Sequence, residues 1–221
     1  PLQYDIFHLL FPNAKATILG DINQSLTRRV GSDFYDQVQQ SLAIENTVRY
    51  TLNKSFRCST EILRFGLQFL SEAPSIESFN RSGEAVALNT CADFAALCDT
   101  IVAEVDACRA KGYESICLIT KSEAACQRLH RALRDRITVH QLRSHDDTLQ
   151  GTLIMPVSLT KGLEFDAVLL CDADATTYRD AEDASLLYVI ATRALHRLAI
   201  LCEGTPSPLI TTTKEDAPCM N

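Results

Sequence analysis

The sequence predicts an α/β fold: a doubly wound, mainly parallel sheet with helices on both faces. From Glu84 onward, short runs rich in β-forming residues alternate with longer helical patterns, and parallel strands need such crossover helices. The run Phe165–Cys171 (FDAVLLC) is continuously apolar, which is typical of a strand covered on both faces. These two observations favour one α/β core in the second half of the chain.

Each predicted strand is a short apolar or β-branched run between turn residues, and each predicted helix has apolar residues at helical spacing. After Glu84 we expect strands at Glu84–Leu88, Ser115–Thr120, Ile137–Leu142, Thr152–Val157, Phe165–Cys171 and His196–Cys202, and helices at Phe94–Arg109, Ala124–Arg134 and Ser185–Ala194. Before it we expect helices at Leu2–Phe11, Asp33–Leu42 and Ser59–Leu70, with Ser59 as an N-cap, and strands at Ala16–Leu19 and Asn46–Leu52. The polar segment Ala73–Gly83 is predicted to be a linker.

Composition limits the class of protein. The chain has 221 residues, of which 46% are hydrophobic, enough for one sizeable core with a small appendage. The formal net charge of −7 gives no general attraction to nucleic acid, so any DNA contact needs a local groove. We expect no membrane association, because no apolar run approaches the roughly 20 residues of a membrane span. The chain lacks a secretory signal and an initiator Met, so we expect a cytoplasmic location and a start inside a longer protein.

The nine cysteines lack the spacing of zinc ligands, because none forms a C-x-x-C pair. A zinc site and a disulfide framework are the functional alternatives. We expect reduced cysteines that act as small buried hydrophobes, and no metal site. They are Cys58, Cys91, Cys98, Cys108, Cys117, Cys126, Cys171, Cys202 and Cys219.

Four short segments end a strand or open a helix, where phosphate chemistry is usually placed in open α/β sheets. Each alone has an ordinary structural explanation, such as a turn or a solvated arginine, so only their occurrence together and in order favours a function. The segments are Gly20–Gln24 (GDINQ), Ser55–Ser59 (SFRCS), Thr160–Asp166 (TKGLEFD) and Leu186–Ala194 (LLYVIATRA).

In this order the four segments resemble motifs III, IV, V and VI of superfamily 1 DNA helicases of the UvrD/Rep type. The details FRCSTEI, TKGLEFDAVLL and ATRALHRL look closer to the helicase IV/HelD-like branch. The resemblance implies a RecA-like (P-loop NTPase-like) fold and the C-terminal motor domain of an ATP-dependent DNA helicase or translocase.

The resemblance also divides the chain. Residues 1–30 would be a remnant of the first RecA-like domain with motif III, and residues 31–83 the motif IV segment and linker. Residues 84–203 would form the main body of the second RecA-like domain with motifs V and VI. We expect residues 204–221 to be a flexible tail, because they are rich in Thr and Pro.

The resemblance assigns roles to five residues. Arg57 and Arg193 match arginines that stabilise the transferred phosphate of ATP when the two motor domains close. Gln24 matches a glutamine that senses the γ-phosphate and water. Glu164 matches a glutamate near the ribose hydroxyl, and Gly162 lets the backbone approach the ligand. The predicted catalytic residues are thus Gln24, Arg57 and Arg193, and the predicted nucleotide-binding residues are Gly162, Glu164, Arg57 and Arg193.

Two further residues of these segments are given no chemical role. Tyr188 is expected to pack within its helix, and His196 is expected to be structural.

The sequence departs from the family pattern in ways that limit these roles. It has no GxxxxGK[ST] phosphate loop and no adjacent acidic motif, so Mg²⁺ would be bound mainly by a first domain and this chain alone should not hydrolyse ATP. The run Leu26–Val30 lacks the aromatic that often stacks on a DNA base there, although Arg29 could stack instead. Ser158 stands where a His is usual, and the segment between Arg57 and Glu164 is too short for the large helical insertion of UvrD.

Three functions stay open. The first is an ATP-driven motor on single-stranded DNA, whose partner within the protein is its own N-terminal RecA-like domain. The second is a HelD-like factor that binds RNA polymerase and uses ATP to remodel it without unwinding; the missing aromatic and the acidic charge balance favour it. The third is a motor-like domain retained as a binding scaffold, against which the intact Gln24, Arg57, Glu164 and Arg193 argue.

Overall fold

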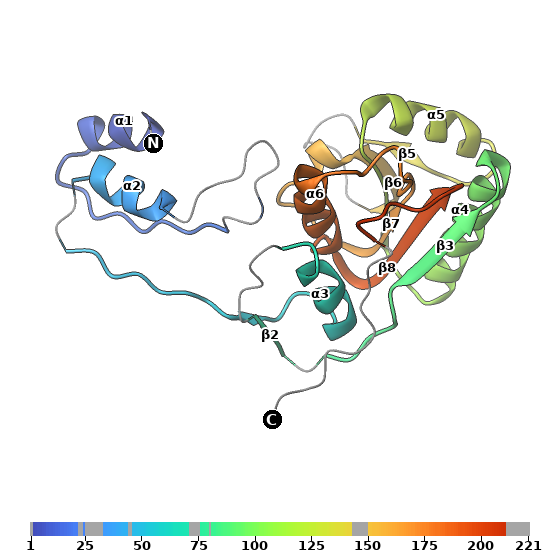
Figure 1. Ribbon diagram of the computed structural model, residues 1–221, viewed down its shortest axis with the longest axis horizontal. Helices are drawn as coiled ribbons and strands as arrows, with labels where there is room; N and C mark the ends of the chain where they lie inside the picture. The colour runs from blue at the N-terminus through green and yellow to red at the C-terminus, as the bar shows by residue number, and fades with distance from the viewer. Residues whose placement is uncertain are drawn as a thin grey trace.

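Six parallel strands form the sheet of the main body, on the right in Figure 1. The computed structural model describes residues 2–21, 24, 33–43, 46–70, 76–79, 81–142 and 150–210. The strand order is β3-β8-β7-β4-β6-β5, and every neighbouring pair is parallel. The strands are β3 (Ala87–Cys91), β4 (Ser115–Thr120), β5 (His140–Gln141), β6 (Gly151–Pro156), β7 (Phe165–Leu170) and β8 (Ala194–Glu203).

Helices cover both faces of the sheet, which confirms the predicted fold class (Figure 1). On one face lie α4 (Phe94–Ala110) and α5 (Glu123–Leu133), whose buried side chains share a core with those of β4 and β7. On the other face lie α3 (Thr60–Leu67) and α6 (Ala181–Ala191), which share a second core with the same strands. Burial on both faces explains why β7 is apolar throughout.

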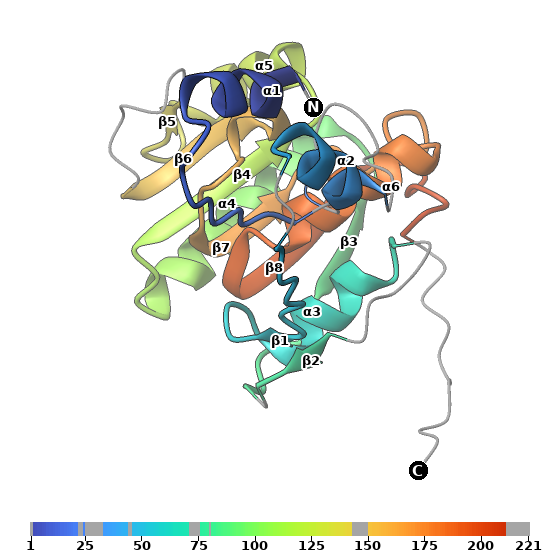
Figure 2. The same cartoon turned by 90° about the vertical axis from the view of Figure 1, so that its left-hand side faces the viewer.

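The first two helices of the chain lie apart from this sheet (Figure 1). Helices α1 (Leu2–Leu10) and α2 (Phe34–Ser41) pack on each other, with the Tyr4 and Phe34 rings 6.2 Å apart. Figure 2 shows the extended segment that leads from α2 down to α3, where β1 (Lys54–Ser55) pairs in parallel with β2 (Glu77–Ser78). Helix α1 has no buried residue, and its apolar side chains are exposed.

Two predicted strands are wrong. Neither Ala16–Leu19 nor Asn46–Leu52 pairs with any strand among the described residues. In Asn46–Leu52, the alternating apolar side chains Val48, Tyr50 and Leu52 are more than 70% exposed, so they do not pack against a sheet. A strand needs a neighbour for its backbone groups, and these segments have none within the described part of the chain.

Other predicted boundaries shift. Helix α6 begins at Ala181 rather than Ser185, because Asp180 caps it by accepting the amide hydrogens of Glu182 and Asp183. The predicted linker Ala73–Gly83 contains β2, and its end is fastened to α3, since Thr60 N donates to the Arg81 carbonyl and Gly83 N donates to Glu61.

The predicted tail also begins too early. Ser207 and Ile210 are buried, and Ser207 Oγ donates to the Tyr178 carbonyl, so residues 204–210 pack on the body. The remaining residues, 211–221, lie outside the described residues, and so do the run Leu26–Val30 and Cys219. All eight cysteines of the described part are unpaired and buried, as predicted for small hydrophobes. No helix in the described part is long and apolar enough to cross a membrane.

Candidate functional site

Arg193 is the centre of the site, and its side chain is only 2% exposed. It follows the last turn of α6, where Thr192 is the C-cap, and precedes β8. Its guanidinium donates to the carbonyls of Val189 (3.1 Å) and Leu163 (3.2 Å), to Thr192 Oγ1 (3.3 Å) and to Gln24 Oε1 (2.6 Å). Because a buried charge is costly unless its donors are paired, these four contacts explain how an arginine can be held in the core.

Gln24 reaches Arg193 from a segment 169 residues earlier in the chain. Its amide nitrogen donates to Asp21 Oδ2 at 2.9 Å, which leaves the amide oxygen facing the guanidinium. The backbone nitrogen of Gln24 also donates to the Asp21 carbonyl, and the Tyr35 hydroxyl donates to the Gly20 carbonyl. The contacts of Asp21 with Gln24 thus orient the glutamine toward Arg193.

Arg57 and Glu164 form the second pair of the site. Arg57 Nε lies 2.6 Å from Glu164 Oε1, and both side chains are about two-fifths exposed (41% and 39%). Arg57 is held in place because the next two residues are buried: Cys58 in the core and Ser59 as the N-cap of α3, whose Oγ accepts the amide hydrogen of Ile62. The pair therefore lies at the solvent-facing side of the buried Arg193.

Gly162 has a backbone reason to be glycine. Its φ is +80°, in the left-handed region, and it forms the turn that leads into β7. A Cβ on Gly162 would meet nothing within 4 Å, so the conformation rather than crowding selects glycine. This turn presents the Leu163 carbonyl to Arg193 and places Glu164 beside Arg57.

The charges of the site influence one another. Burial lowers the pKa of Arg193, and the positive charge of Arg57 lowers it further, whereas Glu164 opposes the shift. Burial also raises the pKa of Tyr188 to about 12, and Asp21 acts in the same direction. Tyr188 is 3% exposed, which agrees with its predicted role in packing.

The fold thus brings together the five residues that were singled out in the sequence. Gln24, Arg57, Gly162, Glu164 and Arg193 come from four segments and form one connected cluster at the amino ends of β7 and β8. Two guanidinium groups beside an amide form a set of planar donors suited to an anion such as a phosphate. The individual roles of these residues stay predictions.

Sequence reasoning missed two features of this site. The first is Asp21, which orients Gln24; the signal was the carboxylate in the GDINQ segment. The second is a pair of exposed aromatic rings beside Arg57. Phe56 and Phe79 are each 63% exposed, and their ring centroids lie 4.7 Å apart. Phe79 comes from the predicted linker, so its proximity to Phe56 is a product of the fold.

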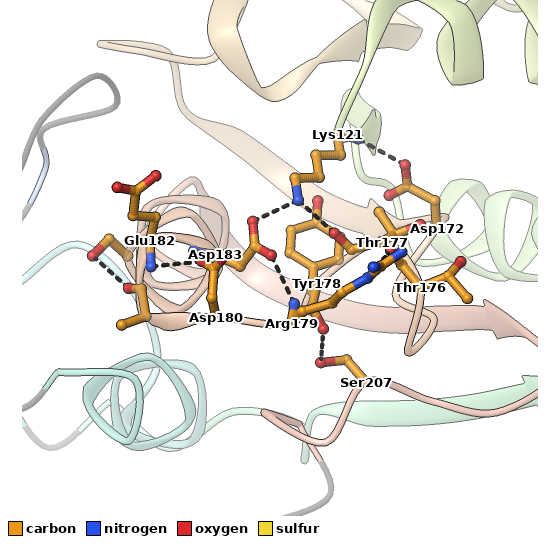
Figure 3. Close-up of polar contacts among 12 residues, drawn as sticks. Lys121, Asp172, Thr176, Thr177, Tyr178, Arg179, Asp180, Glu182, Asp183 and Ser207 are labelled. Carbon is orange, nitrogen blue, oxygen red and sulfur yellow. Dashed lines mark hydrogen bonds and ion pairs between the residues drawn. The ribbon is translucent and has the colours of Figure 1, made fainter.

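The sequence analysis also missed a polar network at the carboxyl ends of β4 and β7 (Figure 3). Lys121, at the end of β4, lies 2.5 Å from Asp183 Oδ1 and donates to the Thr177 carbonyl. Its backbone nitrogen donates to Asp172 at 2.8 Å, and Asp183 Oδ2 accepts the amide hydrogen of Arg179. The network fixes the first turn of α6, at the end of the helix opposite to Arg193.

His196 has structural contacts, in line with the sequence analysis. Arg81 Nη2 donates to its ring at 2.6 Å, and the Tyr113 ring stacks on it at a centroid distance of 5.7 Å. Among the described residues, no group of three or more His, Cys, Asp or Glu side chains is placed to hold a metal ion.

Comparison with known proteins now decides the family. A family model described as the UvrD-like helicase C-terminal domain matches residues 152–201. Among solved structures, the C-terminal domain of a possible DNA helicase from Lactobacillus plantarum WCFS1 is 30% identical; the match covers 71% of this chain and 92% of that chain, with a TM-score of 0.63. The chain belongs to the UvrD-like helicase C-terminal domains. This family assignment agrees with the resemblance that motifs III to VI indicated.

Two other solved structures match more weakly. The C-terminal domain of the DEAD-box protein Dbp5 is 14% identical, with a TM-score of 0.40 and coverage of 57% of this chain and 80% of that chain. Arterivirus nonstructural protein 10, a helicase solved with DNA, is 12% identical, with a TM-score of 0.39 and coverage of 67% and 33%. Both likenesses are too low to inform function. No curated protein sequence matches the UvrD-like chain at a significant level.

Proposed function

We propose that this UvrD-like domain is the second motor domain of an ATP-dependent DNA helicase or translocase and supplies one wall of a shared ATP site. The observation that carries the proposal is the connected cluster of Gln24, Arg57, Glu164 and Arg193. A cluster that joins four distant segments around two arginines is what a phosphate-stabilising wall requires.

Within this proposal, the arginines supply the charge. Arg193 is oriented by four hydrogen bonds, and it would face a developing negative charge by exchanging its contact with Gln24 for a phosphate oxygen. Arg57 is more exposed and would exchange its contact with Glu164 for a phosphate oxygen. Gln24 would orient water or the terminal phosphate, while Glu164 and the Gly162 turn would face the ribose.

The aromatic pair adds a place for the base of the nucleotide. Phe56 directly precedes Arg57, and Phe56 and Phe79 present exposed rings on the same side of the domain. A planar base stacks favourably on such rings. We therefore assign the nucleobase to this pair and the phosphates to the arginines.

A first RecA-like domain would complete the site. It would bring the phosphate loop and the carboxylates that hold Mg²⁺, neither of which this sequence contains. The Gln24–Arg193 hydrogen bond supports this arrangement, since it joins the segment predicted as a remnant of the first domain to motif VI. Single-stranded DNA is the proposed track, and the cytoplasm the proposed location.

The test compares two arginines near α3 in the full-length protein. Arg57→Ala should lower kcat for ATP by about 10³-fold or more, as loss of such an arginine does in related phosphoryl-transfer enzymes. Arg64→Ala, an exposed arginine within α3, is the matched control and should leave kcat unchanged. Phe56→Ala should raise KM for ATP more than it lowers kcat. Equal rates for Arg57→Ala and wild type would contradict the proposal.

The alternative is a HelD-like factor that remodels RNA polymerase with ATP. The net charge of −7 and the branch-specific details FRCSTEI and ATRALHRL favour it. It uses the same ATP site, so the Arg57 test does not separate the two functions. Recovery of RNA polymerase with the full-length protein, together with ATP hydrolysis that single-stranded DNA does not stimulate, would support the alternative.

A further inference from the structure

The two site arginines are carried by two different helices that pack on each other. Arg57 lies two residues before the Ser59 cap of α3, and Arg193 lies two residues after the end of α6 at Ala191. The backbone at neither arginine can move far relative to its own helix, since Cys58 and Ser59 are buried and the Arg193 side chain is hydrogen-bonded. The distance between the backbone positions of the two arginines therefore depends on how closely α3 approaches α6.

Gly66 lies at the contact between these helices. A Cβ on Gly66 would come 3.4 Å from the Ala191 Cβ and 3.6 Å from the Tyr188 ring. Helix pairs sit about 8–10 Å apart, at a distance set by the side chains between them, and small residues allow the shorter distances. Ala191 is the last residue of α6, so this contact lies close to Arg193 along the chain. Gly66 lies in the last turn of α3, so a change there reaches Arg57 through a tilt of the whole helix.

We propose that Gly66 is a positioning residue of the ATP site, because it sets the distance between α3 and α6 and hence between Arg57 and Arg193. This inference rests on the proposed function. Tyr188 supports it: the pKa of this buried tyrosine responds first to burial and then to Asp21, Cys58, Arg193 and Arg57, so the ring that Gly66 contacts lies among the charges of the site.

A series of side chains at position 66 separates spacing from helix stability. Gly66→Ala adds a Cβ at ordinary van der Waals distance, and alanine favours the helix more than glycine. We expect it to keep kcat and to raise Tm by about 2–4 °C. Gly66→Leu also favours the helix, but its side chain reaches beyond the free space and must push α3 away from α6.

The expected effect of Gly66→Leu is on kcat. A displacement of about 1 Å at a catalytic group can cost about 10²-fold in rate, so kcat for ATP in the full-length protein should fall by about 10- to 100-fold. KM should change little, because base stacking and the first domain hold the nucleotide. Removing the nearest atom with Ala191→Gly should restore part of kcat in the double variant.

Leu129→Ala is the control for loss of stability alone. Leu129 is buried on the other face of the sheet, so its truncation should lower Tm and leave kcat unchanged at a permissive temperature. The inference is overturned if Gly66→Leu keeps the wild-type kcat, or if Ala191→Gly restores Tm without restoring kcat. Arg193→Ala is assayed in parallel: if it also keeps the wild-type kcat, the proposed function fails as a whole. If Gly66→Leu keeps the wild-type kcat and Arg193→Ala does not, the positioning role of Gly66 is wrong and the proposed function is not contradicted.

Discussion

Replacing Asp183 with asparagine should destabilise the domain, because this carboxylate holds the first turn of α6 to the sheet. Asp183 is 6% exposed and accepts from Lys121 Nζ (2.5 Å) and from the Arg179 amide (2.7 Å). Asparagine keeps one acceptor oxygen and loses the charge, so at least the contact with Lys121 is weakened.

The size of the effect follows from these contacts. A hydrogen bond to a charged group contributes about 1.5–3 kcal/mol, and the Lys121 side chain is 32% exposed, so solvent screens part of the gain. We expect a loss of about 2–3 kcal/mol in the free energy of unfolding. For a chain of this size that corresponds to a fall in Tm of about 4–12 °C.

The assay is urea and thermal unfolding of the chain at pH 7, with Asp180→Asn as the matched control. Asp180 lies three residues earlier in the same helix and caps it, and asparagine caps as well as aspartate does. Asp180→Asn should therefore change stability by less than about 0.5 kcal/mol. Equal stability of the two variants would show that the charge of Asp183 does not hold the first turn of α6 to the sheet.

The pH dependence of the Asp183 effect gives a second check. Burial raises the pKa of Asp183, but the contacts with Lys121 and the Arg179 amide outweigh it, so the pKa is held below its ordinary value. A lowered pKa in the folded state contributes stability that is present above about pH 4 and lost as pH falls through the lowered value. The difference between wild type and Asp183→Asn should accordingly shrink in acid.

Two further predictions concern a buried carboxyl group and two glycines. Burial raises the pKa of Asp172 to about 7, so the folded state keeps a proton that the unfolded state releases near pH 4. The free energy of unfolding of the wild type should therefore fall as pH rises from about 4 to 7. Asp172→Asn should flatten this decline in urea unfolding. An unchanged decline would contradict the burial of this carboxyl group. Gly162→Ala and Gly112→Ala should each lower the free energy of unfolding by about 1–2 kcal/mol, because both glycines have φ near +80°, where an L side chain is strained. A Cβ at either position would meet no atom within 4 Å, so the backbone conformation is the main cause of the loss. Only Gly162→Ala should also lower ATP turnover in the full-length protein, and equal turnover in the two variants would argue against a role for the Gly162 turn.

Much of the fold was predictable because its signals are local. Ser115–Thr120 and Phe165–Leu170 are apolar runs that fill the middle of the sheet, and their predicted bounds agree with β4 and β7 to within one residue. The segments Ala16–Leu19 and Asn46–Leu52 have equally good local patterns and form no strand. Pairing depends on a neighbouring edge, which no local pattern reveals.

The candidate site divides in the same way. Arg57, Glu164 and Arg193 could be named from the order of short motifs, whereas their mutual contacts could not. The Gln24–Arg193 hydrogen bond and the Phe56–Phe79 pair join segments whose proximity is set by tertiary packing. The Gly66 contact was missed for a similar reason. A glycine inside a helix pattern only weakens the helix prediction, and its packing role becomes visible when the neighbouring helix is known.

The proposed function requires that Arg193 stabilises charge in a nucleic-acid-stimulated ATP site. The most direct measurement is ATP hydrolysis by the full-length protein, wild type and Arg193→Ala, with and without single-stranded DNA. We predict strong stimulation by DNA in the wild type and a loss of about 10³-fold or more in kcat in the variant. Wild-type hydrolysis by Arg193→Ala would contradict the account, and hydrolysis that needs Arg193 but ignores DNA would keep the ATP site and favour the polymerase-remodelling alternative.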